Sequence, residues 1–62
     1  MKEKSENAYY VHYRNDLYNR AYLIELSSYE TALTIANEYA KDEYNSLVSI
    51  ITPDNKVTII KK

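Results

Sequence analysis

The sequence predicts a small α+β domain in which a four-stranded antiparallel sheet carries one helix on one of its faces, in the order ββαββ. Two segments with alternating aromatic and β-branched residues flank a loop rich in Asn and Asp. An amphipathic segment follows, and two further apolar runs then flank a Pro-Asp-Asn turn. A chain of 62 residues has room for one such domain.

The first hairpin is predicted over strands 8–14 and 20–26, "AYYVHYR" and "RAYLIEL". Between them, "NDLYN" supplies turn-forming Asn and Asp side chains. The preceding segment, "MKEKSEN", is polar, charged and without periodicity. We therefore expect a flexible N-terminal tail over residues 1–7 and one domain over residues 8–62.

A helix is predicted over residues 28–43. Ser27 and Glu30 have the spacing of a capping box, in which each side chain satisfies one free backbone amide of the first turn. At 100° per residue the apolar side chains fall on one arc, and three alanines in that arc would let the helix lie close to a sheet. Asn45 suits a left-handed residue after the helix.

The second hairpin is predicted over strands 47–52 and 56–61. Pro53 presets a turn dihedral, and Asp54 can accept a hydrogen bond from its own backbone. Because the chain contains no glycine, Asn55 is the natural residue for the left-handed position of this turn.

The predicted strand order is 2-1-3-4. The helical crossover makes the second and third strands parallel in direction, so placing the first strand between them leaves every neighbouring pair antiparallel. The order 1-2-4-3 is the competing arrangement.

The composition excludes several classes of site. The chain has no cysteine, one histidine and a net charge of −1 with the two signs interspersed, which disfavours disulfides, most zinc sites and nonspecific duplex binding. No pattern supplies a nucleophile, a base and an oxyanion donor together, so we expect no enzyme, cofactor or small-molecule substrate. Without a signal-peptide core or an apolar run of membrane-spanning length, a soluble cytoplasmic protein that does not bind membranes is expected.

The sheet face away from the helix is the expected binding face. Tyr9, Val11, Tyr13, Ala21 and Leu23 lack cations and are assigned to the helix side. The opposite face would then hold Tyr10, Tyr22, Ile24, Val48, Ile50 and Ile60, with His12, Arg14, Arg20 and Thr58 at its rim. Aromatic and aliphatic residues edged by arginine are typical of protein interfaces.

The predicted partner-binding residues are Tyr10, His12, Arg14, Leu17, Tyr18, Arg20, Tyr22 and Ile24. Leu17 and Tyr18 either insert into a partner or fold back over the helix end, and the sequence leaves both open. His12 is expected at an interface rather than as a general base, since no partner group for catalysis accompanies it. The eight tyrosines are also compatible with β-propensity and AT-rich codons alone.

These observations predict a non-enzymatic protein–protein interaction module that forms a homodimer, because a domain this small has a thin stability margin and needs support. The abundance of residues with AT-rich codons suggests a low-GC bacterium or one of its phages. A small, cysteine-free chain of this kind without catalytic motifs is typical of phage or mobile-element proteins that inhibit a host enzyme or defence system. The alternative is single-stranded nucleic-acid binding, with bases on Tyr10 and Tyr22 and phosphates on Arg14 and Arg20. The net negative charge makes nucleic acid the less favoured partner.

Overall fold

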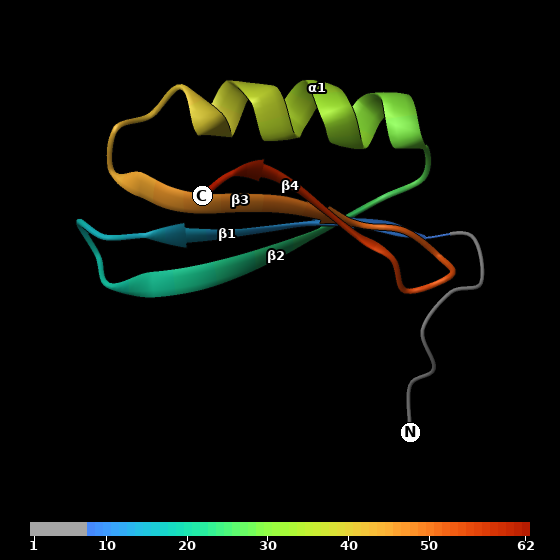
Figure 1. Ribbon diagram of the computed structural model, residues 1–62, viewed down its shortest axis with the longest axis horizontal. Helices are drawn as coiled ribbons and strands as arrows, with labels where there is room; N and C mark the ends of the chain where they lie inside the picture. Colours follow the sequence, from blue (N-terminus) through green and yellow to red (C-terminus); the bar gives the residue numbers. More distant parts are fainter. Residues whose placement is uncertain (1–7) are drawn as a thin grey trace.

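The computed structural model describes residues 8–62, so the expected flexible tail over residues 1–7 lies outside the described residues. Four strands form one antiparallel sheet in the order β2-β1-β3-β4, and helix α1 lies along one face of it (Figure 1). This confirms the predicted ββαββ fold and strand order. The elements are β1 (Tyr9–Asn15), β2 (Arg20–Leu26), α1 (Tyr29–Ala40), β3 (Asn45–Ile51) and β4 (Val57–Lys61).

The loop of the first hairpin is one residue shorter than expected. Strand β1 continues to Asn15, which pairs with Arg20, so the loop consists of residues 16–19. Asn19 closes the loop with a φ of 54°, a left-handed conformation that asparagine tolerates better than most residues. A four-residue loop places odd-numbered β1 residues opposite even-numbered β2 residues, and Val11 accordingly pairs with Ile24.

The helix begins at Tyr29, one residue later than predicted. Ser28 is the N-cap, and its Oγ accepts a hydrogen bond from the Thr31 amide at 3.2 Å. The predicted capping box between Ser27 and Glu30 is therefore wrong by one position. Ser28 has the extended backbone of a cap residue, and the hydroxyl three positions ahead of the Thr31 amide is the one that reaches it.

The end of the helix also differs from the prediction. The helix stops at Ala40, and the Lys41 amide donates to the Glu38 carbonyl at 3.2 Å. Asn45 does not provide a left-handed residue: it is the buried first residue of β3. Its Nδ2 donates to the Tyr39 carbonyl at 2.9 Å, so Asn45 satisfies the helix end through its side chain.

The turn of the second hairpin forms as predicted. The Asn55 amide donates to the Thr52 carbonyl at 2.9 Å, which places Pro53 and Asp54 at the two central positions of a β-turn. Asn55 has a φ of 68°, confirming its left-handed conformation. Beyond the turn, the Thr52 amide donates to the Lys56 carbonyl at 2.9 Å and begins the strand pairing.

The core lies between helix α1 and the central strands. Val11, Val48 and Ile50 are fully buried under Ala32 and Ala36 of the helix. The small alanine side chains leave room for the sheet residues, as the sequence predicted. Burying each large aliphatic side chain contributes roughly 1.5–3 kcal/mol, so three of them make a modest core.

Candidate functional site

The sheet face opposite helix α1 is built from alternate residues of all four strands, and no other element within residues 8–62 covers it (Figure 1). Residues that pair across antiparallel neighbours share a face, so the strand register identifies its members. We call this surface the open face. It comprises Tyr10, His12 and Arg14 of β1, Ala21, Leu23 and Glu25 of β2, Leu47, Ser49 and Ile51 of β3, and Val57 and Ile59 of β4.

A row of paired residues crosses the middle of the open face. Leu23 pairs with His12, His12 with Ser49, and Ser49 with Ile59. The small Ser49 side chain is only 3% exposed although it lies on this face, and its Oγ donates to the His12 carbonyl at 3.5 Å. Larger neighbours flank it on both sides. Leu23, Val57 and Ile59 are 59%, 58% and 51% exposed.

The predicted assignment of the β2 side chains to the two faces of the sheet is wrong. Tyr22 and Ile24 lie on the helix side, opposite Tyr13 and Val11, and Ile24 packs against the core. Leu23, which was assigned to the helix side together with Ala21, lies on the open face. The cause is the four-residue loop, because a change of one residue in loop length moves every side chain of the second strand to the other face.

The expected faces of β3 and β4 are also wrong. Val48 and Ile50 are buried beneath the helix, and Ile60 packs against the same core. Thr58 pairs with Ile50 and shares that side. The reason is that both faces of β3 and β4 carry aliphatic residues, so the hydrophobic pattern of the hairpin does not select a side.

Three of the predicted binding residues share the open face as expected: Tyr10, His12 and Arg14. The others lie elsewhere. Arg20 is exposed at the start of β2, on the strand side that also carries Tyr22. The predicted set is therefore divided between the two faces of the sheet.

The hairpin loop carries the remaining predicted residues, Leu17 and Tyr18. Their side chains are 58% and 69% exposed. Arg14 joins the open face to this loop, since its Nε lies 3.4 Å from the Asp16 carboxylate and its Nη2 donates to Asn19 Oδ1 at 2.6 Å. Arg14 is thus ordered by the loop as well as by its strand.

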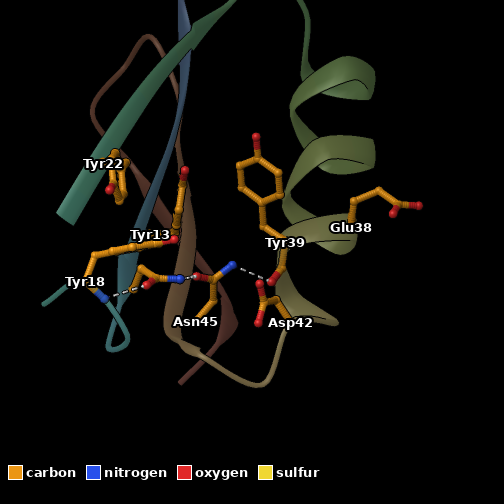
Figure 2. Close-up of a pocket in the computed structure, with 8 residues that line it drawn as sticks. Tyr13, Tyr18, Tyr22, Glu38, Tyr39, Asp42 and Asn45 are labelled. Carbon is orange, nitrogen blue, oxygen red and sulfur yellow. Dashed lines mark hydrogen bonds between the residues drawn. The ribbon is translucent and has the colours of Figure 1, made fainter. Parts of the chain in front are cut away.

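Two buried asparagines fix the loop against the helix end. Asn15 Nδ2 donates to Asn45 Oδ1 at 2.8 Å, and Asn45 Nδ2 donates in turn to the Tyr39 carbonyl (Figure 2). On the loop side, the Tyr18 amide donates to Asn15 Oδ1 at 3.0 Å. These bonds satisfy polar groups that would otherwise be costly to bury. They also hold β1, β3 and α1 in a set arrangement.

A cleft of about 430 Å³ lies between this loop and the C-terminal end of α1 (Figure 2). The Tyr13 and Tyr22 rings are stacked, with centroids 5.0 Å apart and planes inclined by 21°. The Tyr39 ring meets Tyr13 edge-on at 4.6 Å. We call this the tyrosine cleft; its lining residues are Tyr13, Asn15, Tyr18, Tyr22, Glu38, Tyr39, Asp42 and Asn45.

Tyr13 is at the centre of these aromatic contacts. Burial raises the pKa of its hydroxyl above the ordinary value of a tyrosine, and the neighbouring Tyr39 and Tyr22 phenols add to the shift because they disfavour a second negative charge. Tyr13 therefore stays neutral, so the charges in the cleft lining come from its carboxylates.

The sequence did not indicate the tyrosine cleft because its residues come from four elements, from the first hairpin loop and from the loop between α1 and β3. A correct register for the first hairpin would have placed Tyr22 beside Tyr13. The approach of Tyr39 and Asp42 depends on where the helix ends over the sheet, and no local pattern encodes that position.

Comparison of the chain with models of protein families, with curated proteins and with solved structures gives no match. Within the described part of the chain, no three His, Cys, Asp or Glu side chains are grouped so that they could hold a metal ion. Within residues 8–62, helix α1 is neither long enough nor apolar enough to span a membrane.

Proposed function

We propose that this protein is a small binding module that acts through protein contacts rather than catalysis, and that its open face associates with the open face of a second copy. The observation that carries the proposal is the exposure of Leu23, Val57 and Ile59, each more than half exposed on one side of the sheet. Leu23 lies on one edge strand and Val57 and Ile59 on the other, so exposed aliphatic side chains occupy both edges of the same face. Exposed apolar surface on one side of a small protein is typical of interaction sites.

The open face is small for a protein interface. Its strands have at most seven residues, about 23 Å, and the four of them span about 19 Å, which gives an area on the order of 400 Å². Each partner contributes about 800 Å² to an interface of standard size, so a dimer formed through this face lies at the small end of the range. A second copy would bury the aliphatic residues of both chains at once.

The charges of the open face also favour a two-fold arrangement. Arg14 pairs with Ala21 near the hairpin loop, whereas Glu25 pairs with Tyr10 at the opposite end of the same strands. A two-fold axis that crosses the strands would bring Arg14 of one copy over the Glu25 end of the other. Such self-complementarity is required of an interface in which the same patch meets itself.

The test is sedimentation velocity over a wide range of protein concentration, with two matched substitutions. Leu23→Lys places a charge on the open face, in the middle of edge strand β2, and Leu17→Lys places the same charge on the hairpin loop. The two leucines are 59% and 58% exposed, so the pair differs in location and hardly in exposure.

We expect a dimer for the wild type and for Leu17→Lys, and association weakened by roughly 100-fold or more for Leu23→Lys, since each dimer of that variant would bury two lysines in its interface. Circular dichroism would establish that both variants remain folded. A wild type that sediments as a monomer up to millimolar concentration, or equal effects of the two substitutions, would contradict the proposal.

Association through the open face would leave the Leu17–Tyr18 loop and the polar side of α1 for a further protein partner. An inhibitor of a host enzyme or defence system would bind its target there. The nucleic-acid alternative loses its motivation in this arrangement. Tyr10 and Tyr22 lie on opposite faces of the sheet and form no common platform for stacked bases.

A further inference from the structure

We propose that the tyrosine cleft binds the guanidinium group of an arginine side chain presented by another protein. The cleft shares no lining residue with the open face, so this proposal stands or fails independently of dimer formation. It rests on three features of the cleft: its aromatic walls, the sign of its charges and the hydrogen bonds that hold its shape.

The walls of the cleft supply electron-rich ring faces. Four of the eight tyrosines of the chain line it, and the rings of Tyr22 and Tyr39 both contact the ring of Tyr13. Tyr18 lies at the outer edge and is 69% exposed, so its ring is available to a ligand (Figure 2). Cations are attracted to the faces of such rings within about 6 Å of the centroid, and arginine is found in these contacts more often than lysine.

The charged residues that line the cleft are both acidic. Glu38 and Asp42 come from the last turn of α1 and the residues just after it, and no lysine or arginine of residues 8–62 is part of the lining. Two lysines lie close by. Lys41 Nζ is 3.7 Å from the Glu38 carboxylate, and Lys61 Nζ donates to the Asp42 backbone carbonyl at 2.9 Å.

These lysines leave the acidic character of the cleft in place. The Lys41–Glu38 pair is largely exposed on both sides, and exposed pairs of this kind contribute little and exchange readily with another cation. Lys61 contacts a main-chain oxygen rather than the Asp42 carboxylate. The Glu38 carboxylate points away from the tyrosine rings, whereas Asp42 lies near Tyr39 and Asn45 (Figure 2). Asp42 is therefore the charge that would repel an anionic ligand and attract a cationic one.

A guanidinium fits this combination better than an ammonium. It is planar, so it can stack on a tyrosine ring, and its fork of N–H donors matches a carboxylate. The ammonium of lysine is a strongly hydrated point charge and gains less from aromatic walls. The Asn15–Asn45–Tyr39 hydrogen bonds fix the cleft before any ligand arrives, which lowers the entropic cost of binding.

The test is a titration of ¹⁵N-labelled wild-type protein followed by amide chemical shifts. The probes are Nα-acetyl-arginine amide, the uncharged citrulline analogue of nearly the same shape, and Nα-acetyl-lysine amide. We expect saturable shifts at Tyr18, Tyr39 and Asn45 with the arginine probe, and binding at least about 10-fold weaker with citrulline, the difference that a charge-dependent contact of about 1.4 kcal/mol gives. The affinity of the lysine probe should lie between the affinities of the arginine and citrulline probes.

Substitutions in the lining give the second half of the test. Glu38→Gln combined with Asp42→Asn removes both charges, and Asn at position 42 retains an oxygen to accept the Tyr44 amide. Tyr18→Ala removes an exposed ring, and Tyr44→Ala is its control, because Tyr44 is 45% exposed and lies outside the lining. We expect several-fold weaker binding of the arginine probe for the first two variants and none of that loss for Tyr44→Ala.

A titration with a short peptide that has one central arginine, compared with a titration with guanidinium ion, distinguishes a ligand presented by a protein from a free cation. The proposal requires the peptide to bind more tightly than guanidinium ion itself. Equal binding of the two would assign the cleft to a small organic cation instead. Equal binding of arginine and citrulline probes, or no saturable shifts in the cleft of the folded wild type, would overturn the proposal entirely.

Discussion

The two faces of the sheet are similar in apolar content and opposite in exposure. On the side under α1, Val11, Val48 and Ile50 have no exposed surface. On the open face, Leu23 and Ile59 are each more than half exposed. Neighbouring residues of the same strands therefore have very different environments, and the position of one helix decides which of them are covered.

This difference shows what a single helix can accomplish in a small domain. Helix α1 has 12 residues and is about 18 Å long, so it covers one face of the sheet, mainly over the central strands β1 and β3, and leaves the other face uncovered. A second apolar face that remained in water would add nothing to stability and would favour aggregation. If the face associates with another chain, those side chains are buried and contribute to stability.

The largest expected effect is a difference in unfolding free energy between substitutions on the two faces. Ile50→Ala should lower the free energy of unfolding by about 3 kcal/mol, because it opens a cavity under the helix. Ile59→Ala should cost well under about 1 kcal/mol in the monomer, since that side chain is 51% exposed. Urea denaturation at low protein concentration measures both. Similar losses for the two isoleucines would show that the open face is already packed within one chain.

The buried asparagine pair should have the next largest effect. Asn45→Ala removes the bonds to Asn15 and to the Tyr39 carbonyl and leaves buried polar atoms without partners, so we expect a loss of about 2 kcal/mol. Asn37→Ala, at an exposed position on the outer side of α1, is the control and should cost very little. If the two asparagine substitutions had equal effects in thermal or urea unfolding, the pair would not hold the helix end to the sheet.

The start of the helix gives a smaller effect with a close control. Ser28→Ala should destabilise the protein by about 1 kcal/mol because the Thr31 amide loses its acceptor. Ser27→Ala changes the adjacent serine and should have almost no effect. A larger loss for Ser27 than for Ser28 in urea unfolding would support the capping box that the sequence suggested.

The smallest expected effect lies in the second hairpin turn, apart from both faces. A hydrogen bond from the Thr52 hydroxyl lowers the pKa of Asp54, with a smaller contribution from the nearby Lys56. Because the pKa of Asp54 is lower in the folded state than in the unfolded state, this contact stabilises the fold above the unfolded pKa. That stabilisation is lost as the pH falls through the folded pKa.

Thr52→Val should raise the pKa of Asp54 toward that of an ordinary aspartate, which carboxyl chemical shifts followed by NMR across acidic pH would measure. The amide shifts of both sheet faces should stay unchanged at neutral pH. An unaltered Asp54 pKa would show that the Thr52 hydroxyl is not its main determinant.

Local features of the sequence predicted local features of the structure. The alternating strands, the amphipathic helix and the Asn55 turn each depend on residues close together in the chain, and all were found near their expected positions. The strand order followed from connection rules that need only the element order. These predictions did not depend on how distant segments pack.

The candidate site could be predicted only in part, because it depends on register between distant segments. Extending β1 by one residue to Asn15 turned Tyr22 and Ile24 toward the helix. The pairing of Val11 with Ile50 joins strands far apart in sequence, where no loop fixes the register. With aliphatic residues on both sides of β3, alternation alone did not show which side the helix covers.

The most direct test of the account is a search for contacts between open faces in a mixture of isotope-labelled and unlabelled protein. Isotope-filtered NMR reports only proton pairs that belong to different copies. The account predicts intermolecular contacts from the methyl groups of Leu23, Val57 and Ile59 and none from Val11 or Val48. No intermolecular contacts at millimolar concentration, or contacts confined to helix α1, would contradict it.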